Sequence, residues 1–449
     1  MRVASPETPV PPGDRPLTRL ERAGAVLLVL GSVLFGAAVV VRSAYQQSRK
    51  TDFGVYARAA DAVRAGRDIY APATCDDNGW HYCYPPPFAI LMVPLADPFP
   101  WDSRASRLPF GASVALWYLL SVTLIWVSAD VLARVALPDA VPGSRRWWYA
   151  RTVPILACVG GAGATLSRGQ VNTLAVALVV MMFANLVRNR PCRAGAWLAA
   201  AAALKVFPAF LAVYPLVRGR WRSGVGFFLG LGLLLVGLPS AVWGFEQSVR
   251  YNRVFADAVL LPGLGLPGDP TRGKELTEPL ATASQSFRAV VQNLRNPDAA
   301  LRARTPADPP PPADPVANRL HWALGGLMLL VTVAVGLRRA TAAVTDQLLL
   351  FGCFCAVMVH LTPVSHPHYY FFAFPLAAGL WCHGAARRPG RAGPGRATVL
   401  ALAAWGLATG LILLPDALSS AMRVFGGGVA ATLGLWAFAL SRLGRPVGG

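Results

Sequence analysis

The sequence has 449 residues, of which 54% are hydrophobic and 14% are charged. Soluble domains carry about 25% charged residues, so this composition excludes an ordinary soluble fold and is typical of a membrane protein. The net charge is +20, and all but three of the 42 basic residues are arginine. Most arginines lie in short connections between apolar segments, without a basic amphipathic face. This pattern favours anchoring at the cytoplasmic membrane surface and argues against nucleic acid as a partner.

The start of the chain is polar. Residues 1–22 are rich in proline and charge and predict a disordered cytoplasmic tail. The apolar run 24–41 follows three arginines and is not followed by a small-residue cleavage site. We therefore expect an uncleaved first span rather than a removed signal peptide. Residues 23–445 are then predicted to form a single transmembrane domain.

The apolar segments of the whole chain, including 24–41, predict an all-α, multi-pass protein of the plasma membrane. There are about twelve such segments, some of them short. An even number places both termini on one side. Arg442 and Arg445, after the last segment, indicate that this side is the cytoplasm. The segments are 24–41, 86–98, 110–135, 152–166, 170–187, 194–217, 223–245, 320–337, 346–361, 368–384, 397–414 and 420–441.

Two basic connections fit this path poorly. The arginines within 145–151 and 188–193 would lie outside the membrane, against the positive-inside rule. Re-entrant hairpins with apices near Gly169 and Pro208 would return both connections to the cytoplasmic side, because broken helices are tolerated where they line a cavity. The sequence leaves both paths open.

In either path the polar loops 43–85 and 246–319 lie on the extracytoplasmic side. The first loop opens with apolar residues at helical spacing, which predicts an interfacial helix at about 54–66. Cys75 and Cys83 lie in the same loop. In an oxidising compartment they form a disulfide or stay as free thiols, and the sequence does not decide between the two.

Two ionisable residues stand out. Asp52 begins the first outer loop, where a carboxylate at the bilayer surface can act as general base for a sugar hydroxyl; the alternative is that it caps the following helix. Lys205 is the only lysine in an apolar segment, where a cation costs about 3 kcal/mol or more on insertion scales. Its natural partner is an anion such as a lipid phosphate. The alternative is snorkelling or pairing with a carboxylate, although 194–217 contains no acidic residue.

The turn His366-Pro367-His368 can hydrogen-bond a phosphate or a sugar hydroxyl, or it is an ordinary pair of loop histidines. No nearby ligand completes a metal site, so we expect neither metal nor cofactor. Weaker candidates for substrate contacts are polar or aromatic residues near these groups: Tyr56, Tyr84, Gln170, Asn172, Gln285 and Tyr369.

In their order along the chain, these residues resemble the polyprenol-phosphate-dependent membrane glycosyltransferases of family 87, which include mannosyltransferases and an arabinofuranosyltransferase. The resemblance runs from about Thr51 to Leu376. It rests on Asp52-Phe53 with Val55-Tyr56, Asp68-Ile69-Tyr70, Tyr84-Pro85-Pro86, Gly169-Gln170-Val171-Asn172, Leu204-Lys205 with Pro208, Gln285-Ser286 and His368-Tyr369.

The resemblance implies a C-type glycosyltransferase fold, a catalytic aspartate at Asp52, and a donor-phosphate role for Lys205 and for His366 or His368. Adjacent histidines are common in the family, whereas Pro367 separates them here, so the functional histidine is open. The implied reaction moves a mannose-like or arabinofuranose-like sugar from a polyprenyl-phosphate donor to a lipid or glycan acceptor on the extracytoplasmic face. Membrane lipids are the other expected partners. The alternatives are a transporter or lipid flippase that uses Lys205 as its substrate or proton site, and a scaffold without catalysis.

Overall fold

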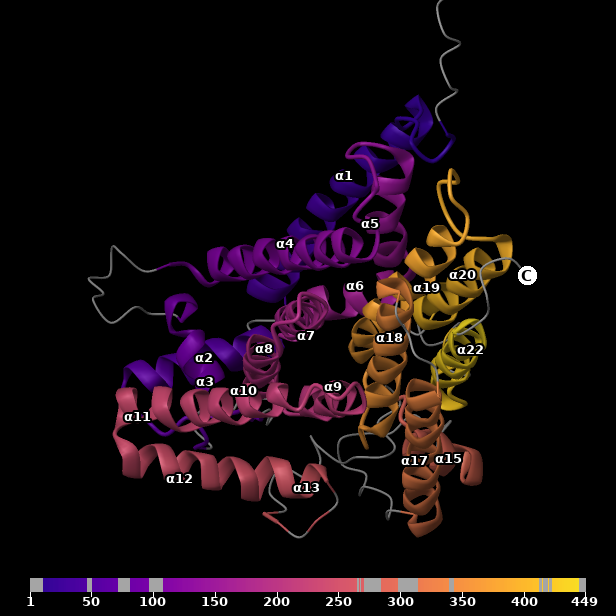
Figure 1. The fold of residues 1–449 in the computed structure, drawn as a ribbon. Helices are drawn as coiled ribbons and strands as arrows, with labels where there is room; N and C mark the ends of the chain where they lie inside the picture. Colours follow the sequence, from indigo (N-terminus) through magenta and orange to yellow (C-terminus); the bar gives the residue numbers. More distant parts are fainter. Residues whose placement is uncertain are drawn as a thin grey trace, which may run out of the picture.

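The computed structural model is helical throughout its described part, which confirms the all-α prediction (Figure 1). No strand occurs among the described residues. Short helices of the 3-10 or π type are labelled η. The structure describes residues 11–46, 51–71, 81–96, 108–264, 266, 268–269, 284–297, 314–338, 343–411, 414, 419 and 422–443.

Five helical stretches in this part of the chain are long and apolar enough to cross a membrane. The protein is therefore a membrane protein, and the count of twelve apolar segments stays a prediction. The five stretches are Arg19–Gln46 (α1, Arg19–Val41, with η1, Arg42–Gln46), Phe110–Ala136 (α4), Arg222–Trp243 (α10, Arg222–Leu231, with η6, Gly232–Gly237, and α11, Leu238–Trp243), Pro315–Arg338 (α17) and Val344–Leu361 (α18).

Other predicted segments are interrupted. The segment 152–166 is divided at Cys158, and 194–217 is divided at Lys205, where the backbone becomes extended. Broken helices occur in membrane proteins where the freed backbone lines a cavity. The remaining elements are α2 (Asp52–Arg64), α3 (Pro86–Leu91), η3 (Val93–Leu95), α5 (Arg145–Ala157), α6 (Val159–Arg168), α7 (Asn172–Val187), α8 (Pro191–Leu204), η5 (Phe207–Ala212), α9 (Val213–Val217), α12 (Phe245–Phe255), η7 (Ala256–Leu260), α13 (Leu261–Gly263), α15 (Phe287–Arg295), η9 (Pro367–Ala373), α19 (Phe374–Ala386), α20 (Arg396–Leu411) and α22 (Gly427–Arg442).

Residues 11–22, predicted as part of a disordered tail, are ordered. The Thr18 hydroxyl accepts a hydrogen bond from the Glu21 backbone N–H at 3.3 Å, and the Glu21 carboxylate accepts one from the Thr18 backbone N–H at 2.6 Å. This capping box starts α1. Glu21 also forms an ion pair with Arg145 of α5 at 2.9 Å. Residues 1–10 lie outside the described part, and the disordered cytoplasmic tail stays a prediction.

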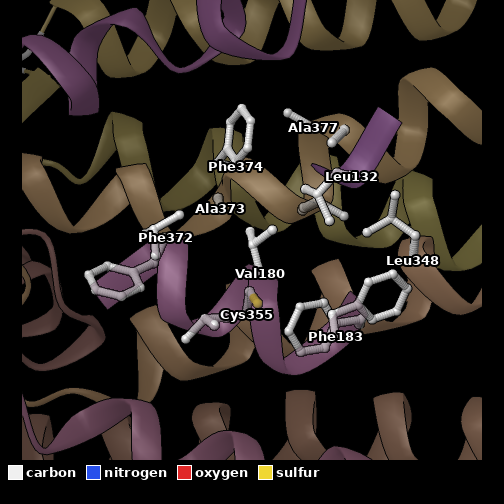
Figure 2. Packing of buried hydrophobic residues seen from close by; sticks show 14 of the residues in the cluster. Leu132, Val180, Phe183, Leu348, Cys355, Phe372, Ala373, Phe374 and Ala377 are labelled. Carbon is white, nitrogen blue, oxygen red and sulfur yellow. The ribbon is translucent and has the colours of Figure 1, made fainter. Parts of the chain in front are cut away.

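The apolar core is centred on α18, in which every residue from Leu348 to His360 is buried. A helix that is apolar on all sides is expected inside a bundle. Phe183 of α7 stacks on Phe351 of α18, with ring centroids 5.0 Å apart. Figure 2 shows Phe183 among the buried side chains that pack near Val180 and Cys355. The core holds together the helices whose ends carry the candidate site.

Helices α7 and α8 form a hairpin with its open end at the candidate site. Asn172 begins α7 and Lys205 follows α8, and their side chains are joined by a hydrogen bond of 2.8 Å. The connection 188–190 closes the hairpin at the other end, about 24 Å away for the 16 residues of α7 at ~1.5 Å each. The basic connection 188–193 and Lys205 thus lie at opposite ends of the hairpin.

Helices α8 and α10 pack with their backbones in contact through glycine. A Cβ atom on Gly226 would meet the carbonyl oxygen of Cys192, whereas one on Gly224 would meet nothing within 4 Å.

We expect Gly226→Ala to lower the free energy of unfolding by about 1–3 kcal/mol, since the backbones must separate. Gly224→Ala, the matched control, should leave it unchanged or slightly higher. Thermal unfolding in detergent measures both, and equal midpoints would contradict this packing.

Candidate active site

A cavity of about 540 Å³ brings most of the predicted site residues together. Its size is that of a typical ligand pocket. The elements around it include α2, the α6–α7 turn, η5, α13 and the turn before η9. The predicted residues in its wall are Asp52, Tyr56, Tyr84, Gln170, Lys205, His366, His368 and Tyr369.

Asp52 is the first residue of α2. Thr51 occupies the N-cap position and makes no side-chain capping bond, so the interpretation of Asp52 as the cap is wrong. The Asp52 side chain is 12% exposed, and its Oδ2 lies 4.0 Å from Nη1 of Arg168. Burial raises the pKa of Asp52 above its ordinary value, although Arg168, a hydrogen bond from Gln170 and Lys205 oppose this rise. The raised pKa makes this carboxylate a stronger base than a free aspartate.

Helix α2 is buried rather than laid on a surface. Phe53, Tyr56 and Ala60 all have less than 2% of their surface exposed. The Phe53 ring packs against Phe110 and Trp117 of α4, with centroids 5.6 and 6.0 Å apart. The prediction of an interfacial helix is therefore wrong, because residues on nearly every side of α2 contact protein. This packing holds Asp52 in a fixed place.

The Lys205 ammonium is held by amides and an aromatic ring. Its Nζ donates to Oδ1 of Asn172 at 2.8 Å and lies 3.5 Å from Oε1 of Gln170. It also lies 4.3 Å from the centre of the Tyr369 ring, a cation–π distance. The residue is 7% exposed, so it does not snorkel. In the described part of the chain, no carboxylate forms an ion pair with it.

Gln170 connects residues of the segment 51–85 to this lysine. Its Oε1 lies 3.1 Å from the hydroxyl of Tyr56 and 3.1 Å from that of Tyr84. The two hydroxyls are 2.8 Å apart, and the rings meet edge to face with centroids 5.0 Å apart. The two tyrosines and Gln170 therefore form one hydrogen-bonded group beside Asp52.

The histidine turn also lines the cavity. The rings of His366 and His368 stack with centroids 5.4 Å apart, and the His368 carbonyl accepts a bond from Nδ2 of Asn172 at 3.0 Å. Burial, with the nearby cations Arg168 and Lys205, lowers the pKa of His366 to about 3. The imidazole is thus neutral at physiological pH. Its buried Nδ1 has no hydrogen-bond partner and can contact a ligand.

The family model of glycosyltransferase family 87 matches residues 82–363, more than half of the chain. The chain belongs to glycosyltransferase family 87. The matched range contains Tyr84, Gln170 and Lys205 but neither Asp52 nor the histidine turn. No curated protein matches the chain. The membership indicates glycosyltransferase activity and leaves the sugar, the donor and the acceptor open.

Two predicted site residues of this glycosyltransferase lie outside the cavity wall. Asn172 stands behind Lys205 and orients it. Gln285 fixes the histidine turn instead: its backbone N–H donates to the Ser365 carbonyl at 2.5 Å, and its Nε2 donates to the Arg423 carbonyl at 2.6 Å. Cys75 lies outside the described residues, so the choice between a disulfide with Cys83 and free thiols stays open.

Sequence reasoning missed two parts of the glycosyltransferase site. Arg168 lines the cavity beside Asp52. Its position directly before the Gly169-Gln170 motif was the available signal. An apolar wall also lines the cavity, and its residues are distributed over η5, η7, α13, α17 and α18, so no local pattern could identify them. They include Phe207, Phe210, Val259, Leu260, Leu264 (directly after α13), Trp322, Met358 and Leu361.

The contact between Asn172 and Lys205 should contribute measurably to the free energy of unfolding. We expect Asn172→Leu to lower the free energy of unfolding by about 1.5–3 kcal/mol, because the ammonium loses its nearest acceptor. Replacing the lysine as well, in Asn172→Leu with Lys205→Met, should recover part of the loss since no charge is then left without its acceptor. Thermal unfolding of the purified single and double variants tests this. Strictly additive effects would show that the two side chains are not coupled.

Proposed function

We propose that this glycosyltransferase moves a sugar from a polyprenyl-phosphate donor to a lipid or glycan acceptor on the extracytoplasmic face of the plasma membrane. One observation carries the proposal: a single cavity joins a carboxylate and two cations to an extended apolar wall. A polyprenyl-phosphate sugar has the matching parts, since its phosphate is anionic and its isoprenoid chain is apolar. Mannose and arabinofuranose are the sugars that the family suggests.

In the proposed reaction Asp52 is the general base. An acceptor hydroxyl gives its proton to the carboxylate while its oxygen attacks the anomeric carbon of the donor sugar. The bond between that carbon and the phosphate oxygen breaks, and polyprenyl phosphate leaves with the electron pair. The single displacement inverts the anomeric centre. Phosphate is a good leaving group, so the protein mainly positions the reactants and stabilises the developing charge.

The donor phosphate is assigned to the side of the cavity formed by Lys205 and the histidine turn. Lys205 supplies positive charge, and His366 offers a ring nitrogen that is free of protein partners. His368 stacks on His366 and holds its ring in place. Tyr56, Tyr84 and Tyr369 surround the remaining polar space, where we place the sugar.

The α7–α8 hairpin supports the extracytoplasmic position of this site. Lys205 lies at its open end and the arginines of 188–193 at its closed end. Arginines in short connections favour the cytoplasmic side, so the cavity belongs on the opposite side. A cytoplasmic position for the basic connection 188–193 favours the path with re-entrant hairpins over a path of twelve full spans.

Replacing the base tests the reaction. We expect Asp52→Asn to lower kcat about 10²–10⁴-fold, because the acceptor hydroxyl loses its base, while polyprenyl phosphate still binds. Asp61→Asn, on the same helix and paired with the exposed Arg67, is the matched control and should keep full activity. The assay uses purified protein in lipid with radiolabelled polyprenyl-phosphate sugars and membrane extracts, and follows labelled product and free polyprenyl phosphate. A flippase would leave the lipid intact, and near-normal transfer by Asp52→Asn would exclude the general-base role.

The pH dependence gives a second test. The carboxylate works only when deprotonated, so kcat/KM should fall as the pH drops through the pKa of Asp52. Burial raises that pKa. The fall of kcat/KM at low pH, the acid limb of the profile, should therefore occur at a higher pH than the ordinary pKa of an aspartate. The residual turnover of Asp52→Asn should lack this limb. If the limb persists unchanged in the variant, it belongs to another group.

A further inference from the structure

Arg168 is the one guanidinium that lines the cavity in the described part of the chain. It ends α6, and its side chain is 42% exposed. Its distance of 4.0 Å to Asp52 is an ion pair at the limit of contact and is too long for a hydrogen bond. The side chain therefore reaches both the base and the open space of the cavity.

The backbone after Arg168 fixes this position. Gly169 has a φ of 67°, the left-handed conformation that favours glycine. Its carbonyl accepts a hydrogen bond from Nε1 of Trp117 at 2.9 Å. A Cβ atom at this position would come within 2.7 Å of the Phe53 Cβ, so only glycine lets the turn approach α2 this closely. Arg168 is thus placed next to Asp52 by contacts on both sides of the turn.

The two basic side chains of the cavity differ in whether their N–H donors already have acceptors within the protein. The ammonium of Lys205 has an amide acceptor at 2.8 Å, a second at 3.5 Å and an aromatic ring over it. The guanidinium of Arg168 carries five N–H donors, and among the described residues no acceptor lies within hydrogen-bond distance of them. Arg168 therefore has more N–H donors available for an incoming anion than Lys205 has.

We propose that Arg168 binds the donor phosphate directly and that, on donor binding, its guanidinium leaves Asp52 for the phosphate. The assignment rests on the proposed function. A guanidinium matches the geometry of two phosphate oxygens, whereas an ammonium acts as a point charge. The exchange frees the carboxylate from its ion pair at the moment when it must accept a proton. Donor binding thereby prepares the base.

A binding experiment tests the first half of the proposal. The purified protein in lipid nanodiscs is titrated with a polyprenyl phosphate and, separately, with the neutral polyprenol of the same length. We expect wild type to bind the phosphate more tightly and Arg168→Gln to lose about ten- to a hundredfold of that preference, with unchanged affinity for the alcohol. Arg168→Lys should lose less. Arg134→Gln removes the same charge at an exposed position, where Arg134 pairs with Asp130, and should behave as wild type.

The outcomes separate the proposal from the function it rests on. If wild type itself does not distinguish phosphate from alcohol, the polyprenyl-phosphate donor is wrong. If wild type and Arg168→Gln show the same preference and Lys205→Met alone abolishes it, the phosphate site of Arg168 is overturned and the proposed function survives. The alcohol serves as the folding control, because a misfolded variant would lose both ligands.

A pH profile tests the exchange of partners. The charged and titratable groups that act on Asp52 or respond to it are Arg168, Lys205, Tyr56, Tyr84 and Tyr369. Removing the Arg168 cation should move the acid limb of kcat/KM to higher pH, because kcat/KM reports the free enzyme, in which the pair exists. The acid limb of kcat, which reports the donor complex, should move less. Equal movement of both limbs, or of neither, would overturn the exchange.

Discussion

The hydrogen bond between Lys205 and Asn172 is the constraint on which the rest of the site depends. An ammonium in an apolar interior must have acceptors, and here two amides and an aromatic ring supply them in place of water. Asn172 also binds the His368 carbonyl, and Gln170 also contacts two tyrosine hydroxyls. Lys205 thereby joins the hairpin α7–α8, the tyrosines of the segment 51–85 and the histidine turn.

The polar groups lie where helices begin, end or break. Asp52 starts α2, Arg168 ends α6, Lys205 follows α8 and His366 precedes η9. A continuous helix satisfies its own backbone and offers only its flank, whereas a break lets side chains from several directions converge on one space. The buried α18 and the aromatic packing of α7 against it hold these helix ends in fixed relative positions. The arrangement therefore combines a rigid apolar core with a polar site at its interruptions.

The sequence predicted the features that follow from composition and from single unusual residues. A carboxylate at the start of a polar loop and a lysine in an apolar segment made Asp52 and Lys205 candidates, and the resemblance to the family gave Asp52 its expected role as the base. Both residues line one cavity. The sequence could not predict contacts made between distant segments. Helical spacing assigns α2 an exposed face because periodicity does not show that other elements cover it. The hydrogen bond from Gln285 to Ser365 joins residues 80 positions apart, so no local pattern predicts it.

The charges in the cavity favour donor binding before the proposed transfer and departure of the product after it. Without ligand, one carboxylate faces the guanidinium of Arg168 and the amine of Lys205, whose pKa burial lowers to about 7. A donor phosphodiester favours the protonated amine and neutralises the excess positive charge of the site. Transfer leaves a phosphate monoester, which is more negative, and protonates Asp52, so the product is held by two cations with no opposing carboxylate. Loss of the proton from Asp52 restores that negative charge beside the product phosphate. The same carboxylate that accepts the proton therefore also promotes departure of polyprenyl phosphate, and the guanidinium of Arg168 can return to it as the product leaves.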